Sequence, residues 1–287
     1  MAGQGSRPQP IDVERAAPEI KALVERVRDV MGIPWSPVTW RSYAAYPRVM
    51  RLFWERIEPA VATEDVRREA LAIAERAYRE AADWYRPGYQ AGVSDHDRQR
   101  IARELDAFTF GNAQLLIQQV ALSHAVRGEV EDRPCTPGAR AGPSAYRRPE
   151  LQLVDEEGAP DPIRRLYQDI RQTLALPFVP CDYRALAKWP TFLQAAWEDL
   201  KPWRQRDEYH CLQVGLGKLA EDASRRLCPP VRFEGYEVRE GLGDPDELPN
   251  LQRTLGLLTQ LLPELLASDA LFRIGAAAGE PVAPPRP

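Results

Sequence analysis

The chain has 287 residues, of which 44% are hydrophobic and 28% are charged, and its formal net charge is −4. Because acidic and basic residues are both abundant, the composition does not indicate a nucleic-acid or anionic-membrane partner. No run approaches the roughly 20 apolar residues of a membrane span, and the first ten residues lack the apolar core of a signal peptide. We expect a cytoplasmic protein with one large domain or two ordinary ones.

The cysteine and histidine positions predict neither a disulfide framework nor a metal site. The four cysteines show no C-x-x-C pair and no regular spacing, and the three histidines lack the spacing of metal ligands. The sequence also contains no glycine-rich nucleotide motif and no G-x-S-x-G. We therefore expect no metal and no cofactor.

Helical periodicity dominates the first half of the chain. Pro34 and Pro37 should end the first helix, and Pro47 suits the first position of a later one. The predicted helices are 20–31, a short helix after Thr39, 49–57, 64–85 and 97–125, the last with a break near Gly111 and Asn112.

A segment rich in proline and glycine, 128–162, separates this half from a second helical half. A weakly alternating stretch, 231–238, is expected to form a short extended piece, and Pro263 should kink the last helix. The predicted helices of the second half are 163–174, a short helix from Asp182, 190–200, 205–227 and 248–277.

Residues 34–59 and 177–202 align without a gap at a constant offset of 143, which indicates one structural unit used twice. We predict an all-α fold of two tandem helical repeats that form an intramolecular pseudo-dimer, with shared packing of Trp54, Trp197, Tyr46 and Trp189. The predicted divisions are a first repeat 13–127, a linker 128–162, a second repeat 163–277, and disordered tails 1–12 and 278–287.

Two polar residues lack a counterpart in the other copy. Asp182 aligns with Thr39, and Asn112 aligns with Leu262 at an offset near 150. One interpretation is structural: Asp182 caps its helix, and Asn112 is a helix kink or a satisfied core amide. The other is a single site between the copies, in which the acid and the amide act together and helix starts near residues 38 and 181 hold a small carboxylate.

The aligned blocks around Trp35 and Asp182, together with the FGNAQLL segment around Asn112, resemble the group I 2-haloacid dehalogenases over about residues 15–275. The resemblance implies an all-α pseudo-dimer that removes halide from short 2-haloalkanoic acids with inversion at C2. It implies that Asp182 and Asn112 are the essential acid and amide, and that Trp35 lines the pocket. Two positions depart from the pattern, since Val38 stands for a phenylalanine and Cys181 for a serine.

From this resemblance we expect Asp182 to activate a water that attacks C2 directly, with Asn112 orienting it. The substrate-binding residues would be Trp35, Val38, Cys181 and Phe178. The expected partner is a small 2-haloacid, with no nucleic acid and no membrane, and a homodimer is compatible with the sequence. The alternatives are a relative with the same fold that takes another small 2-substituted acid, a non-catalytic scaffold, and a peroxidase-like helical protein, which would need the missing C-x-x-C pair.

Overall fold

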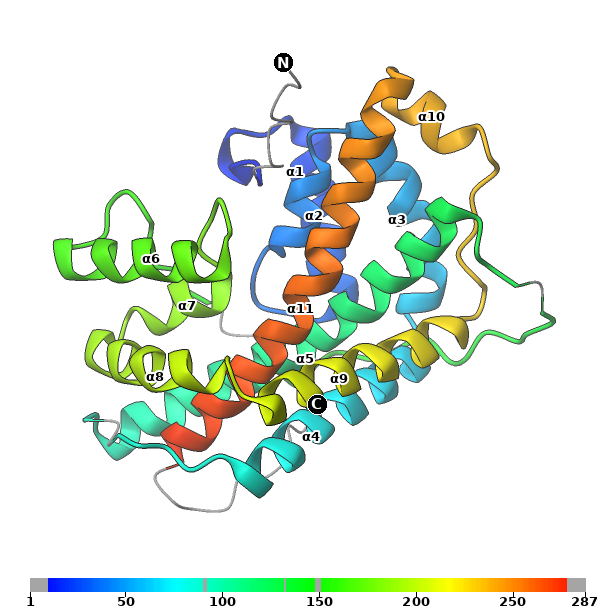
Figure 1. The fold of residues 1–287 in the computed structure, drawn as a ribbon. Coiled ribbons are helices and arrows are strands. Elements are labelled where there is room, and N and C mark those ends of the chain that lie inside the picture. Colours follow the sequence, from blue (N-terminus) through cyan, green and yellow to red (C-terminus); the bar gives the residue numbers. More distant parts are fainter. Residues whose placement is uncertain (1–9, 90–91, 132, 148–150, 278–287) are drawn as a thin grey trace.

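The computed structural model describes residues 10–89, 92–131, 133–147 and 151–277, and within them the regular elements are all helices (Figure 1). The predicted all-α class is therefore observed. In chain order the elements are η1 Val13–Arg15, α1 Pro18–Met31, α2 Val38–Tyr43, α3 Pro47–Val61, α4 Glu64–Trp84, α5 Asp95–Arg127, η2 Ala145–Arg147, α6 Asp161–Leu174, α7 Cys181–Leu186, α8 Pro190–Trp203, α9 Asp207–Arg225, α10 Glu237–Leu242, η3 Pro245–Glu247 and α11 Leu248–Ala276.

The helix ends follow local sequence rules. Pro47 begins α3 and Pro190 begins α8, because proline has a helical φ and no N–H to leave unsatisfied. Gly32 ends α1 with φ 66°, in the left-handed region that glycine adopts without strain. Ala175 ends α6 with φ 54°, so the same cap forms there without a glycine.

Equivalent helices begin at a constant spacing along the chain. The starts of α1 to α4 lie at 18, 38, 47 and 64, and those of α6 to α9 lie 143 residues later, at 161, 181, 190 and 207. Ring contacts recur in the same way: Trp40 meets Trp54 edge-on at 5.1 Å, and Tyr183 meets Trp197 edge-on at 5.6 Å.

These aromatic contacts correct part of the sequence interpretation. Trp54 and Trp197 pack against rings of their own halves, so the expected ring packing between the halves is wrong for them. Tyr46 and Trp189 do reach the other half, but through hydrogen bonds. The Tyr46 hydroxyl donates to Glu247 at 2.7 Å, and the Trp189 indole donates to Asp97 at 3.0 Å.

The two longest helices, α5 and α11, cross in the middle of the molecule and make its most extensive helix–helix contact (Figure 1). The predicted break in α5 is wrong, since the helix runs uninterrupted through Gly111 and Asn112. Residues 231–236 form no strand, and α10 begins at Glu237.

Among the residues that the structure describes, one helical stretch, 245–276, is long and apolar enough to cross a membrane, although the sequence predicted no such span. Of its most apolar window, 67% is buried inside the fold. Its contact with α5 explains why it is apolar: it is a core helix whose apolar faces are covered by other helices.

The linker forms backbone hydrogen bonds with the start of α4 and the residues before it. Glu64 donates its N–H to Ala139 at 2.9 Å, and an isolated antiparallel bridge joins Thr63 to Arg140. Cys135 and Cys228 form a disulfide with a sequence separation of 93, so the expectation of no disulfide is wrong for this pair.

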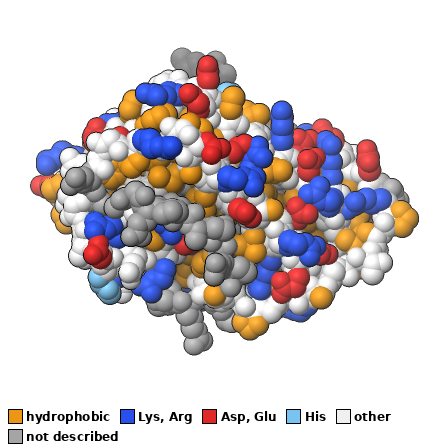
Figure 2. Space-filling view, turned by 90° about the horizontal axis from the view of Figure 1, so that it is seen from below, with side chains coloured by type: hydrophobic (Ala, Val, Ile, Leu, Met, Phe, Trp, Pro, Cys, Tyr) orange, Lys and Arg blue, Asp and Glu red, His pale blue; other side chains and the backbone are white. Residues whose placement is uncertain are grey.

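The predicted tails lie mostly outside the described residues, which begin at 10 and end at 277. Where the first tail is described, it is attached: Ile11 donates its N–H to Arg41 at 3.3 Å and packs against the core. On one face of the molecule, acidic and basic side chains are interspersed, as the composition suggested (Figure 2).

Candidate active site

Asp182 is the second residue of α7 and is 2% exposed. The N-cap of α7 is Pro180, and no side chain caps the helix. The interpretation of Asp182 as an N-cap is therefore wrong. Its carboxyl group is directed instead to the interior, where helix α5 passes.

Asn112 connects α5 to two acids. Its Nδ2 donates to Oδ2 of Asp182 at 2.8 Å and lies 3.2 Å from Oδ2 of Asp269 on α11. Asn112 is 2% exposed, and α5 continues through it without a break. The structure thus brings together the acid and the amide that the sequence singled out.

Burial sets the charge behaviour of this acid. It raises the pKa of Asp182 to about 6, because the low-dielectric interior disfavours the ionised form. Hydrogen bonds from Asn112 and Asp269 oppose this shift by stabilising the carboxylate. An acid with such a pKa is ionised at neutral pH yet a stronger base than an exposed aspartate, which suits proton abstraction.

Asp269 is a member of the cluster that the sequence analysis missed. It is 0% exposed, and burial raises its pKa well above the usual range, with the nearby Asp182 raising it further. A signal was present, since Asp269 is a lone acid within the apolar run 265–272, and such acids are rarely buried without a partner.

Trp35 lies directly beside the amide-bearing turn of α5. Its ring centroid is 4.3 Å from that of Phe108, and a Cβ added at Gly111 would come within 2.3 Å of its indole. Only a glycine lets the indole approach α5 so closely, one residue before Asn112. Trp35 therefore lies buried against α5, one residue from the amide.

Cys181, the first residue of α7, contacts residues that follow α1 in the chain. Its Sγ lies 3.8 Å from Nη2 of Arg41 and 4.0 Å from the carbonyl oxygen of Ser36. Burial raises the pKa of Cys181, so it is a neutral thiol, which does not favour a role as nucleophile.

Val38 and Phe178 complete the predicted set. Val38 is the first residue of α2, and Phe178 lies between α6 and α7. Each is 7% exposed and belongs to the same hydrophobic core as Trp35 and Cys181. Their burial is compatible with apolar walls of a closed site.

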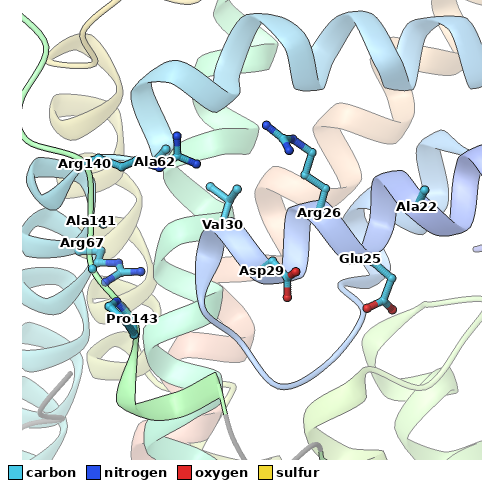
Figure 3. A pocket seen from close by; sticks show the side chains of 11 residues that line it. Ala22, Glu25, Arg26, Asp29, Val30, Ala62, Arg67, Arg140, Ala141 and Pro143 are labelled. Carbon is cyan, nitrogen blue, oxygen red and sulfur yellow. The ribbon is translucent and has the colours of Figure 1, made fainter.

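A surface pocket of about 530 Å³ lies elsewhere, between α1, the start of α4 and the linker (Figure 3). None of the predicted site residues lines it. Arg26, which does line it, is paired with Glu58 at 2.5 Å. We therefore place the candidate active site at the buried acid–amide cluster and not in this pocket.

The fold and the cluster define an all-α protein with a buried carboxyl group that accepts a hydrogen bond from an amide. Residues 34–178 match the family described as halocarboxylic acid dehydrogenase DehI. The (R)-2-haloacid dehalogenase of Pseudomonas putida is 30% identical over 277 residues, covering 92% of this chain and 91% of that protein. The (R)-2-haloacid dehalogenase of Rhizobium sp. (strain NHG3) is 27% identical, with 79% and 91% covered.

One more relative and one solved structure are also similar to this chain. A configuration-inverting 2-haloacid dehalogenase of Pseudomonas sp. (strain 113) is 25% identical, with 94% of this chain and 90% of that protein covered. A solved complex of D-2-haloacid dehalogenase with L-LA has the same fold, with a TM-score of 0.86, 24% identity and coverage of 95% and 97%. The chain belongs to the halocarboxylic acid dehydrogenase DehI family, and the resemblance to 2-haloacid dehalogenases, with the enzyme class it implied, is confirmed.

Proposed function

We propose that the protein hydrolyses short-chain 2-haloalkanoic acids to 2-hydroxy acids by direct attack of a water that Asp182 activates. The observation that carries this proposal is the buried contact of 2.8 Å between the Asn112 amide and the Asp182 carboxyl group, in a chain of this family. The names of its relatives support the reaction class, since they are described as 2-haloacid dehalogenases, two of them configuration-inverting.

In the proposed step, the water oxygen attacks C2 opposite the carbon–halogen bond. The C–O bond forms as the carbon–halogen bond breaks, and the halide leaves with the bonding electron pair. Asp182 takes one proton from the water. The products are a 2-hydroxy acid of inverted configuration, a halide ion and a proton that Asp182 later releases to solvent. Asn112 orients the carboxylate or the water, and orientation of this kind can lower a barrier by several kcal/mol.

The substrate would be surrounded mostly by apolar side chains. Trp35, Val38 and Phe178 would contact the halogen and the alkyl group. The substrate carboxylate would be bound by backbone N–H groups near residues 38 and 181. Because Val38 is smaller than the expected phenylalanine and Cys181 is a weaker donor than the expected serine, these two positions would set the substrate range.

We also propose that the chain is an intramolecular pseudo-dimer with repeats 13–127 and 163–277 joined by the linker 128–162. Support comes from the constant spacing of the helix starts and from the matched caps of α1 and α6. Tyr46 and Trp189, which occupy aligned positions at the offset of 143, each donate a hydrogen bond to the opposite half.

The function is tested by measuring halide release from each enantiomer of 2-chloropropionate. The wild type should release halide, and Asp182→Asn should lose this activity while keeping its helical circular dichroism. In a single turnover with excess enzyme in heavy-oxygen water, the label should enter the product. Label found first in Asp182 would instead show a covalent aspartyl ester and refute direct attack.

A second candidate follows from Val38 and Cys181. A relative with this fold and a roomier pocket would take a larger or differently substituted 2-substituted acid, or would lack catalysis. A panel of 2-substituted carboxylic acids, screened for halide release and for thermal stabilisation of the protein, separates these possibilities.

A further inference from the structure

A second carboxyl group shares the candidate site with Asp182. Asp269 projects from α11 and is 0% exposed. The same Asn112 nitrogen that lies 2.8 Å from Oδ2 of Asp182 lies 3.2 Å from Oδ2 of Asp269, so the two carboxyl groups meet at one amide. One amide and two acids therefore form a single buried cluster from α5, α7 and α11.

The surrounding groups do not neutralise two negative charges. Among the described residues, neither carboxyl group has an ion pair. Arg273, the cation nearest in sequence on the same helix, forms an ion pair with Asp106 at 3.0 Å. Arg204, the C-cap of α8, is paired with Glu264 at 2.7 Å. The titratable groups that interact with Asp269 are Asp182 and Tyr183 of α7 and Tyr78 of α4. Tyr78 in turn donates to Asp106, which is paired with Arg273.

Two carboxylates in contact, inside a protein and without a cation, repel each other strongly, so such pairs share a proton. We propose that Asp269 is held as a neutral carboxylic acid that donates a hydrogen bond to Asp182, so that the pair carries one negative charge and that charge resides on Asp182. This inference rests on the proposed function for its catalytic meaning. Asp269 is then a positioning residue, since it acts on the base and not on the substrate.

The assignment gives each member of the cluster a distinct task. Asp182 receives two hydrogen bonds, one from the Asn112 amide and one from the Asp269 acid, which fix its carboxylate and leave a remaining lone pair for the attacking water. When Asp182 takes the proton of that water, both acids are neutral, and the proton of Asp269 stays where it was. The charge thus moves from Asp182 to the departing halide without any change at Asp269.

The test compares two substitutions by the pH dependence of kcat for halide release. Asp269→Leu removes the donor to Asp182, so the acidic limb should move to higher pH by about one unit, with activity recovering at alkaline pH. Asp269→Asn keeps an N–H donor and the shape, so its limb should remain close to that of the wild type. Asp106→Asn, at a partly buried acid of α5 that is paired with Arg273 of α11 and not with Asp182, is the control and should leave the limb in place.

Two outcomes would overturn the proposal. A limb of Asp269→Asn that moves to lower pH would show that a negative charge had been removed, so Asp269 would be ionised. Limbs that are unchanged in both variants would show that Asp269 does not act on the base.

A readout that does not need turnover separates this proposal from the proposed function. Infrared difference spectra should show the carbonyl band of a protonated carboxylic acid in the wild type at pH 8, and Asp269→Asn should lose it. If the wild type releases no halide but the band is present and is lost in the variant, the proposed function fails while the neutral state of Asp269 stands. If the band is missing from the wild type, the inference about Asp269 fails whether or not halide is released.

Discussion

The amide nitrogen of Asn112 lies 2.8 Å from Oδ2 of Asp182, so a side chain of α5 reaches the first turn of α7 across 70 residues of sequence. The bond is buried, and the amide lies within 3.2 Å of Asp269 as well. A donor in this position stabilises the ionised form of Asp182 and fixes its orientation. The Asp182 carboxyl group therefore depends on α5 for both its charge and its orientation.

Asn112→Ala should lower kcat about 10- to 100-fold, because a hydrogen bond to a charged group contributes roughly 1.5–3 kcal/mol. The acidic limb of the pH profile should also move to higher pH, since the lost bond had lowered the pKa of Asp182. Steady-state halide release from pH 5 to 9 measures both effects. Gln114→Ala is the control, because Gln114 is a buried amide of the same helix that donates instead to the Met31 carbonyl at 3.1 Å; it should leave the limb unchanged.

Asp182→Asn should abolish activity and yet stabilise the protein at neutral pH. The pKa of Asp182 is raised to about 6 by burial, so the folded state binds a proton more tightly than the unfolded state. The stability that this tighter proton binding contributes is fully present below the unfolded pKa, near 4. It is lost as pH rises through about 6. A difference of about two pKa units corresponds to roughly 2–3 kcal/mol.

Urea unfolding at pH 4 and pH 8 tests this sign. The variant should be more stable than the wild type at pH 8 and nearly equal to it at pH 4. A variant that is less stable at both pH values would contradict a desolvated carboxylate at this position. In the wild type, kcat should fall as pH decreases below about 6, because Asp182 becomes protonated.

Gly111→Ala should damage the site through Trp35. The added Cβ would lie 2.3 Å from the indole, so the indole or the helix must shift, at a cost of about 1–3 kcal/mol for overpacking. The shift also displaces the apolar wall, so KM should rise. Gly256→Ala on α11 is the matched control: nothing lies within 4 Å of its added Cβ, and a helical glycine replaced by alanine should gain about 0.5–1 kcal/mol. Thermal unfolding and KM for 2-chloropropionate check both variants.

Much of the fold could be predicted from local sequence. Prolines and helical periodicity located most helices to within a few residues, because these signals act through neighbouring backbone groups. The predicted break at Gly111 and Asn112 was wrong for a tertiary reason: glycine is required there by the approach of Trp35, not by the backbone of α5. A glycine selected for a close contact resembles a helix breaker when only the sequence is read.

Two members of the buried cluster could be predicted where the two aligned segments differ. Asp182 and Asn112 were found because their aligned positions hold Thr39 and Leu262. Asp269 was missed because its role depends on the distance between α11 and α7, which no local pattern reports. The pairing of Cys135 with Cys228 was missed for the same reason, since its 93-residue separation has no regular spacing to reveal it.

Cys135→Ser should lower the free energy of unfolding by about 2–4 kcal/mol, because the disulfide closes a long loop and restricts the unfolded chain. Cys228→Ser and the double substitution should have the same effect, and Cys211→Ser, at an exposed free cysteine, should have none. Urea unfolding with and without reductant measures this.

Disulfides persist in oxidising surroundings, so thiol counting on protein purified without reductant shows whether the bond between Cys135 and Cys228 is formed where the protein is made. Equal stability of wild type and Cys135→Ser under oxidising conditions would contradict the assignment.

Val38→Phe should narrow the range of substrates. Val38 is 7% exposed at the start of α2, next to the segment that carries Trp35. A phenylalanine there occupies volume that the alkyl group of a longer acid would need, and a difference of one methylene in an apolar pocket changes kcat/KM by about 10-fold or more. The ratio of kcat/KM for 2-chloropropionate to that for 2-chlorobutyrate should therefore rise about 10-fold. Val231→Phe, at a buried valine outside the site that is 3% exposed, controls for general overpacking and should leave the ratio unchanged. An unchanged ratio in Val38→Phe would place the alkyl group elsewhere in the site.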